Sequence, residues 1–319
     1  MKAIGGYFGL EVSEKKEYYP DAIHLNTGRN ALEYIMISKN YKYIHLPLYT
    51  CKVLLEPLTR NNISYKYYSV DKNFEPIFDF SSLKNDECFL YTNYFGFKEE
   101  YIFSLSKKCK NLIIDNAQAF YCKPIDGVAT FYSPRKFFGV PDGAYLYIDT
   151  KINTIIAKDN SFERFEHLLK RIDLSSDLGY SDFIKNENAL SNMPILEMSA
   201  ITQKLLSSIN YEKIALKRQR NYRYLEKHLK TLNKYDFEYK ENHVPMVYPF
   251  FSDNLNLRNR LIENKVYTGQ YWKEVLELVE NDSIEYQFVS NIVYLPIDQR
   301  YKEADLSRII ELIKNEHNN

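Results

Sequence analysis

A short stretch of polar residues marks the point where the first predicted strand gives way to a helix. It reads Asn-Thr-Gly-Arg-Asn-Ala-Leu and covers residues 26–32. Thr27 can cap the helix, and Gly28 allows a ligand to approach the backbone closely. The free amides and the positive end of the helix dipole would favour a phosphate group here. Taken alone the turn is a weak signal, because most such junctions bind nothing.

In a second stretch, a strand pattern ends on a carboxylate. Residues 111–118 read Asn-Leu-Ile-Ile-Asp-Asn-Ala-Gln, so a strand pattern delivers Asp115 to the loop at its carboxyl end. Open α/β sheets bind their ligands at that edge. Asp115 could hold a protonated pyridine nitrogen, which keeps a cofactor ring electron-poor. The alternative is a simple N-cap for the segment that follows.

A third stretch places a lysine among aromatic residues. Residues 131–139 read Phe-Tyr-Ser-Pro-Arg-Lys-Phe-Phe-Gly. Poor solvation of Lys136 would favour the free amine that Schiff-base chemistry needs. Ser133, three residues earlier, could donate its hydroxyl to a phosphate. A solvated surface lysine is the alternative, and for a single lysine it is the usual outcome.

The elements that must position these residues alternate along the first half of the chain. Up to about residue 150, short apolar runs rich in β-branched and aromatic residues alternate with amphipathic helical patterns. This alternation predicts a mostly parallel sheet with helices on both faces. We expect a large α/β domain over residues 1–209, and a small α+β domain over residues 210–319 that begins with one long charged helix.

Composition limits the classes of function. The chain has 319 residues, of which 45% are hydrophobic and 26% charged, as in soluble globular proteins. Forty-two basic residues balance forty-two acidic ones, so no net charge attracts nucleic acid or an anionic membrane. No apolar run predicts a signal peptide or a membrane span. Four cysteines without a CxxC pair predict a reduced, cytoplasmic protein without a metal site.

Together the three stretches resemble a known family. A phosphate turn, then a strand-end Asp with Gln three residues on, then Ser-x-x-Lys before a glycine-containing loop is similar to the order in fold-type-I pyridoxal-phosphate (PLP) enzymes. The closest resemblance is to the DegT/DnrJ/EryC1/StrS sugar aminotransferases. The resemblance implies a PLP-dependent aminotransferase that moves an amino group, which we expect to come from glutamate, to a keto-sugar nucleotide in surface polysaccharide or related biosynthesis.

The same resemblance implies roles for individual residues. Lys136 would be the catalytic lysine that carries PLP. Eight further residues would contact the cofactor: Thr27, Gly28 and Arg29 at the phosphate turn, Tyr49 stacked on the ring, Asn93 near its phenolic oxygen, Asp115 at the pyridine nitrogen, Gln118 beside the ring, and Ser133 at the phosphate. Arg29 stands where the family usually has Thr.

Several alternatives remain open. The chain could catalyse another PLP reaction, such as a lyase, dehydratase or acyl-transfer reaction. It could also be a non-catalytic relative that binds a sugar nucleotide or a protein partner. Arg300 could meet a donor carboxylate or could only fix the last turn of the chain. The resemblance further implies a homodimer with its sites at the subunit interface.

Overall fold

The computed structural model describes residues 4–318, and within them seven strands form one large sheet in the order β1-β7-β6-β5-β4-β2-β3. The strands are β1 Ile23–Leu25, β2 Tyr43–Pro47, β3 Ser64–Tyr68, β4 Glu87–Thr92, β5 Leu112–Asp115, β6 Ala129–Tyr132 and β7 Ala144–Tyr147. Strands β2 to β6 are parallel to one another, whereas β7 is antiparallel to both β6 and β1. The sheet is therefore mostly parallel, as predicted, and the carboxyl ends of β1, β2, β4, β5 and β6 lie at one edge.

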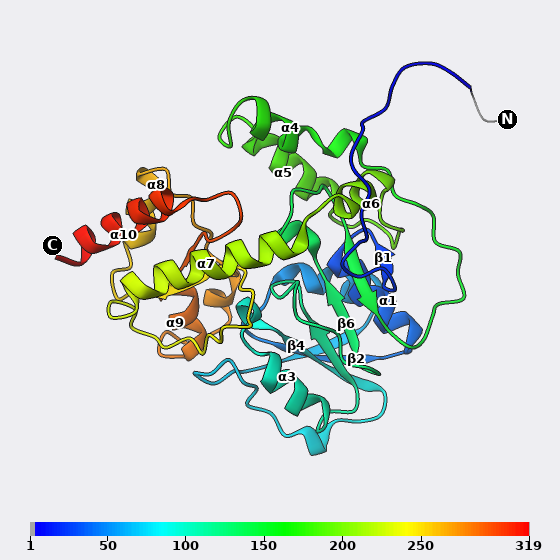
Figure 1. The fold of residues 1–319 in the computed structure, drawn as a ribbon. Helices are drawn as coiled ribbons and strands as arrows, with labels where there is room; N and C mark the ends of the chain where they lie inside the picture. The colour runs from blue at the N-terminus through cyan, green and yellow to red at the C-terminus, as the bar shows by residue number, and fades with distance from the viewer. Residues whose placement is uncertain (1–3, 319) are drawn as a thin grey trace.

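Helices cover both faces of this sheet because the central strands β4, β5 and β6 carry buried residues on both faces. Cys88 and Leu90 of β4 pack in one hydrophobic cluster, and Phe89 and Tyr91 pack in the other. The first cluster contains residues of α1 (Gly28–Ser38) and α2 (Leu55–Arg60), and the second contains residues of α3 (Glu99–Ser106). The layered α/β architecture that the sequence predicts is confirmed (Figure 1).

After β7 the chain is mainly helical. The remaining elements are α4 Glu166–Asp173, α5 Tyr180–Ala189, α6 Ala200–Ser207, α7 Tyr211–Leu229, β8 Tyr248–Phe251, α8 Leu257–Glu263, α9 Ile284–Asn291, β9 Ile292–Leu295 and α10 Glu303–Asn318. Short 3-10 turns occur at Lys52–Leu54, Phe80–Ser82, Tyr94–Gly96, Pro134–Lys136, Phe162–Arg164 and Lys273–Glu277. The long helix α7 leads from the sheet towards the C-terminal elements, where β8 and β9 form an antiparallel pair (Figure 1).

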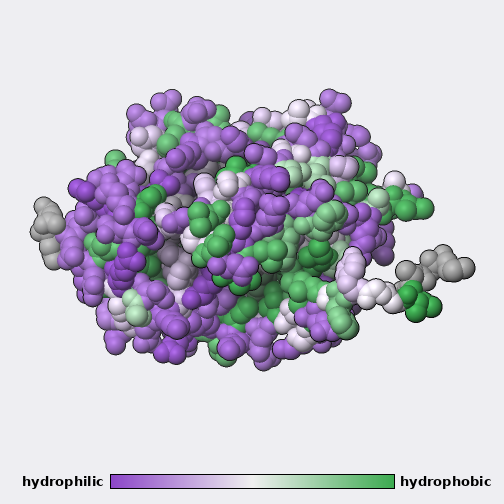
Figure 2. Space-filling model, turned by 90° about the horizontal axis from the view of Figure 1, so that it is seen from above, coloured by the Kyte–Doolittle hydropathy of each residue, from purple (hydrophilic) through white to green (hydrophobic). Residues whose placement is uncertain are grey.

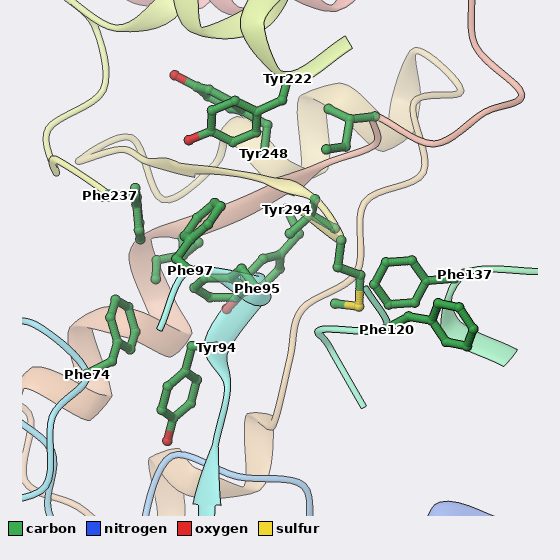
Figure 3. Close-up of a cluster of buried hydrophobic side chains, with 14 of the residues drawn as sticks. Phe74, Tyr94, Phe95, Phe97, Phe120, Phe137, Tyr222, Phe237, Tyr248 and Tyr294 are labelled. Atoms are coloured by element: carbon green, nitrogen blue, oxygen red, sulfur yellow. The ribbon is translucent and has the colours of Figure 1, made fainter. Parts of the chain in front are cut away.

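An aromatic cluster joins the sheet to the C-terminal elements. We define it as Tyr49, Phe74, Tyr94, Phe95, Trp272, Phe288 and Tyr294, all of them buried. Phe74 stacks on Phe288 with ring centroids 4.1 Å apart, and Phe95 lies 5.7 Å from Tyr294 (Figure 3). Because one continuous hydrophobic core contains residues from both parts of the chain, the two parts pack as one body.

Within residues 4–318, no helix combines the length and the apolar character that a membrane crossing would require.

Candidate active site

The carboxyl edge of the sheet brings several of the predicted residues together. Thr27 follows β1, Asp115 ends β5, and Ser133 follows β6. Strands β5 and β6 are direct neighbours, and Asp115 pairs in register with Phe131. We call Thr27, Gly28, Asp115, Ser133 and Lys136 the strand-end site.

The turn at the start of α1 has the geometry of an anion cradle. The Thr27 hydroxyl accepts the Asn30 N–H at 3.2 Å and so caps the helix. The first amides of a helix have no acceptor within it, so those of Gly28 and Arg29 are available to a ligand. A Cβ atom added at Gly28 would lie 3.9 Å from the Ser133 Cβ atom. The turn after β1 therefore faces the loop after β6.

Arg29 does not extend this cradle. Its guanidinium pairs with Glu56 of α2, and the same carboxylate also accepts the Asn192 N–H. The side chain thus ties α1 to α2 and to the loop before α6. The Arg29 side chain therefore stabilises the packing of these segments, and its backbone amide remains available for the predicted phosphate contact.

Asp115 is a buried carboxylate without a full set of partners. One oxygen accepts the Ala117 N–H at 2.8 Å, as a local cap would. Burial raises the pKa of Asp115, and the nearby Lys136 ammonium opposes this shift. The Asp115 carboxylate and the Lys136 ammonium therefore interact electrostatically, so the two side chains lie in the same part of the molecule. A cationic N–H donor against the remaining oxygen would stabilise the charged form.

Lys136 ends a 3-10 turn, and its surroundings differ from the sequence-based expectation. The expected poor solvation is wrong: the Lys136 side chain is exposed, whereas Phe137 and Phe138, the two residues that follow it, are buried in the core. Among residues 4–318, no carboxylate forms a salt bridge with it. The preceding Arg135 pairs with Glu187 of α5. Lys136 is thus held by its backbone while its amine stays accessible.

The side chains of Tyr49, Asn93 and Gln118, which were predicted to contact the cofactor, form hydrogen bonds within the protein instead. The Tyr49 side chain is fully buried in the aromatic cluster, with its ring 4.6 Å from Trp272 and its hydroxyl bonded to Tyr294. It has no open face on which a cofactor ring could stack, so the predicted stacking by Tyr49 does not fit this structure. The reason is tertiary: the C-terminal elements pack against the loop after β2.

Asn93 and Gln118 hold the strand ends together. The Asn93 side-chain amide donates to the Oδ1 atom of Asn116 at 3.0 Å, and the Oδ1 atom of Asn93 accepts the Lys98 backbone N–H. The Gln118 oxygen accepts the Phe95 N–H at 3.0 Å. Both side chains are almost completely buried. They fix the loops after β4 and β5 around Asp115, and their direct contact with a cofactor remains a prediction.

The lysine loop is the segment 133–143 between β6 and β7, which contains Lys136. A buried polar cluster packs against this loop, and the sequence analysis did not predict it. The Asp142 carboxylate accepts the Ser199 and Thr202 hydroxyls and pairs with Arg164. Burial raises the pKa of Asp142 to about 6. Next to it, Gly143 has a φ of +114°, and a Cβ atom there would approach Thr202 to 3.0 Å. Only glycine suits this position, which fixes the loop between Lys136 and β7.

A cavity of about 380 Å³ opens beside Lys136 and was also missed. It lies between the lysine loop, the α4–α5 helices and the turn that contains Asp298 and Arg300. Arg218 of α7 forms part of its wall. Helix α7 carries many charges, and nothing in the sequence distinguishes the one arginine that is buried from its exposed neighbours.

Known structures share this fold. No protein-family model matches the sequence, and no curated protein does so either. A DegT DnrJ EryC1 StrS aminotransferase from Brucella abortus aligns with 93% of this chain and 86% of its own at a TM-score of 0.63 and 14% identity. The sugar aminotransferase CalS13 from Micromonospora echinospora aligns over 93% and 87% at 0.60 and 13%. DesI, solved in the presence of its TDP-sugar product, aligns over 92% and 79% at 0.63 and 13%. The predicted fold-type-I architecture is confirmed.

Proposed function

We propose that the chain is a PLP-dependent aminotransferase. The observation that carries the proposal is the meeting of three features at one sheet edge: the α1 amides, the buried Asp115 and the accessible Lys136 amine. The fold shared with sugar aminotransferases supports it. A division into a cofactor-binding part, residues 1–209, and a smaller part, residues 210–319, belongs to the same proposal.

The residues present fit the cofactor. The Gly28 and Arg29 amides, together with the Ser133 hydroxyl, would hold its phosphate at the positive end of α1. Asp115 is buried, and no cationic side chain among the described residues forms a salt bridge with it, so a protonated pyridine nitrogen would supply the missing donor. Asn93 and Gln118 would lie next to the ring and would hold the loops after β4 and β5 in place through their hydrogen bonds to Asn116 and Phe95.

When bound, PLP supplies an aldehyde for amines and an electron-poor ring that accepts negative charge from the substrate's α-carbon. The chain's own residues would do the rest. Lys136 would hold the cofactor and, once released, would move a proton at the α-carbon of the amino donor. Asp115 would keep the ring nitrogen protonated, and its burial strengthens that interaction because few water molecules screen it.

The substrates we propose are glutamate as donor and a keto-sugar nucleotide as acceptor. DesI, which shares the fold, was solved with a TDP-sugar product. A cavity beside Lys136 provides room for an acceptor. On this basis we place the reaction in the cytoplasm, in surface polysaccharide or related biosynthesis.

We also propose that the chain forms a homodimer. The α4–α5 region exposes large apolar side chains, among them Ile172, Leu174, Leu178 and Tyr180. Figure 2 views the molecule from above and shows hydrophobic side chains gathered among the hydrophilic ones. Exposed apolar groups of this size favour burial against another surface. Light scattering on the purified chain would give twice the monomer mass, and a monomeric mass at micromolar concentration would refute the dimer.

The function is tested by a half-reaction. The chain is incubated with PLP, freed of excess cofactor, and mixed with glutamate. We expect a visible absorbance band that glutamate bleaches while 2-oxoglutarate appears in equal amount. PLP binding without oxoglutarate formation would remove the aminotransferase proposal and favour another PLP reaction. A colourless chain whose melting temperature PLP does not raise would remove the cofactor as well.

A further inference from the structure

Three segments that are distant in sequence meet in one buried polar network. They are residues 26–30 at the start of α1, which we call the α1 turn, the lysine loop, and the segment 194–202 that leads into α6. The network contains polar residues that are at most 1% exposed: Asn26, Asn30, Asp142, Ser199 and Thr202. Because water does not reach these side chains, they bind one another and the backbone. The network therefore fixes how the three segments lie relative to one another.

Asp142 attaches the end of the lysine loop to α6. Its Oδ1 atom accepts the Ser199 hydroxyl at 3.1 Å and also accepts the Thr202 hydroxyl. Ser199 is the N-cap residue of α6, and Thr202 lies in the first turn of that helix. The Oδ2 atom of Asp142 accepts from Arg164 at 3.2 Å, and Arg164 also binds Asp159. The Asp142 carboxylate is thus held from two sides.

Gly143, the residue after Asp142, packs against the turn that carries the lysine. A Cβ atom added at Gly143 would lie 3.3 Å from the Cγ atom of Pro134. Pro134 begins the 3-10 turn that ends at Lys136. Because protein interiors are close-packed, a shift of residues 142 and 143 would displace Pro134 and with it the lysine. The position of Lys136 therefore depends on the bonds that Asp142 makes to α6.

The α1 turn contacts the same loop but has further supports of its own. The Gly143 N–H donates to the Asn26 carbonyl oxygen at 2.6 Å. The Asn26 N–H donates to the Leu196 carbonyl oxygen at 2.9 Å, and its side chain binds the backbone of Pro194 and Leu196. Without the Asp142 carboxylate the α1 turn would keep these bonds, whereas the lysine loop would lose its attachment to α6.

The middle of the lysine loop is supported by other segments. The Phe137 carbonyl oxygen accepts from Gln299 at 2.9 Å and from Arg218, and the Pro141 carbonyl oxygen accepts from Asn186 at 2.9 Å. These contacts should keep the loop folded when the residue at position 142 is replaced. The expected consequence of such a replacement is a shift of the loop, and not its unfolding.

We propose that Asp142 is a positioning residue that fixes the Lys136 amine relative to the α1 turn. The inference rests on the proposed function, in which the α1 turn binds the phosphate of PLP and Lys136 bonds to its aldehyde. One molecule can make both contacts only if the two points of attachment lie at the right separation. Asp142 is fully buried, so it acts through Gly143 and Pro134 and not by contact with a ligand.

A positioning role differs from a purely structural role in what it predicts for two related ligands. PLP needs both the α1 turn and the lysine. Pyridoxine 5′-phosphate has the same phosphate and ring nitrogen but carries an alcohol in place of the aldehyde, so it cannot bond to Lys136. Loss of a positioning residue should impair PLP alone, whereas loss of a structural residue should impair both ligands or neither.

The test compares the full chain with Asp142→Ala, well below the melting temperature of either protein. The rate at which the visible band of lysine-bound PLP forms is measured by stopped flow, and the dissociation constants of both ligands are measured by titration. In Asp142→Ala, Arg164 keeps Asp159 as its partner, so no buried cation loses its last carboxylate. Thr202→Val is a milder second variant, because it removes one hydroxyl that binds Asp142 and leaves the loop itself unchanged.

Two controls separate position from stability. Asp142→Asn keeps an oxygen that can accept the Ser199 and Thr202 hydroxyls, so it should restore the position of the loop. Asn233→Ala removes hydrogen bonds to the backbone of Pro249 and Phe251 in the C-terminal part of the chain. It should lower the melting temperature without a change at the strand-end site.

We expect Asp142→Ala to slow formation of the visible band about tenfold and to weaken PLP binding about tenfold, with pyridoxine 5′-phosphate affinity changed less than about twofold. Thr202→Val should show the same difference between the ligands at about threefold. Asp142→Asn should stay within about threefold of the wild type for PLP, because its oxygen still binds the hydroxyls of α6. Asn233→Ala should bind both ligands as the wild type does.

The outcome is separable from that of the proposed function. If the wild type forms the visible band and Asp142→Ala forms it at the same rate, or loses affinity for both ligands equally, the inference fails alone. An Asp142→Asn variant as slow as Asp142→Ala would also overturn it, because the hydrogen bonds to α6 would then not place the lysine. A wild type that binds pyridoxine 5′-phosphate but forms no band with PLP would remove Lys136 from the cofactor site, and both proposals would fail together.

Discussion

The strand-end site and the aromatic cluster lie at the same edge of one sheet, yet they differ in how their polar groups are satisfied. In the aromatic cluster the Tyr49 and Tyr294 hydroxyls bond to each other, and both rings are buried. In the strand-end site, Asp115 is buried with one local donor, and Lys136 is exposed with no carboxylate of residues 4–318 in contact. Complete pairing stabilises the fold, whereas incomplete pairing leaves groups free for a ligand.

The comparison predicts opposite responses to mutation. Changes in the aromatic cluster should lower stability with little direct effect on chemistry. Changes at Asp115 and Lys136 of the strand-end site should abolish chemistry and leave stability almost unchanged, because neither side chain is fully paired within the described residues 4–318.

The largest expected effect belongs to Lys136. Lys136→Ala should abolish aminotransferase turnover, because no other amine would hold the cofactor and move the proton. Turnover of glutamate with a keto-sugar nucleotide is the measurement, and the melting temperature without cofactor should stay near that of the wild type. Lys108→Ala, an exposed lysine after α3, is the control and should keep full activity. Residual turnover of Lys136→Ala above about a tenth of the wild-type rate would contradict the assignment.

Asp115→Asn should lower kcat/KM by about 100-fold or more, since a preorganised charge next to the reacting group is lost. Without cofactor, the variant should be as stable as the wild type or more so. Burial raises the pKa of Asp115, which means that its charge is a cost to the folded chain. Urea unfolding and steady-state kinetics measure the two effects. A large loss of stability with normal kcat/KM would show a structural role instead.

Asp142 provides a pH-dependent comparison behind the lysine loop. Its pKa in the folded chain is raised to about 6 by burial, above the value of about 4 for an unfolded aspartate. The folded chain therefore binds the proton more tightly, so the contribution of this group to stability is present below pH 4 and is lost as the pH rises to 6.

Relative to Asp142→Asn, the wild type should lose up to about 3 kcal/mol of unfolding free energy between pH 4 and pH 6. Urea unfolding of both proteins across this range measures the difference. A difference that does not change with pH would show that the pKa of Asp142 is not raised.

The smallest expected effect concerns the hydroxyl pair of the aromatic cluster. Tyr49→Phe and Tyr294→Phe should each cost about 1–2 kcal/mol of unfolding free energy, because each leaves one buried hydroxyl unpaired. The double variant should cost less than the sum of the two, since both hydroxyls are then absent. Additive losses would contradict a direct bond. A loss of PLP binding in Tyr49→Phe without a loss of stability would show that Tyr49 contacts the cofactor after all.

The sequence predicts the backbone positions of the site better than its side chains. Thr27 and Ser133 follow strands, and Asp115 ends one; the apolar patterns of these strands are local, so the place of the three residues at the carboxyl edge follows from topology. The exposure of Lys136 and the burial of Tyr49 depend on how distant segments pack. Neither is encoded in nearby residues.

Arg218 and the Asp142 cluster illustrate the same limit at greater distance. Arg218 is separated from Phe137 by 81 positions and Asp142 from Thr202 by 60, and only the folded chain brings each pair into contact. A charged helix reads as solvated from its sequence, since one buried position among many exposed ones does not alter the pattern. The cavity beside Lys136 could not be predicted for this reason.

The central claim is that Lys136 holds the cofactor. The chain is loaded with PLP, reduced with borohydride so that any bond between lysine and cofactor becomes permanent, digested, and mapped by mass spectrometry. The account predicts one modified peptide, with the added mass on Lys136. Modification of a different lysine, or none at all in a chain that binds PLP, would contradict it.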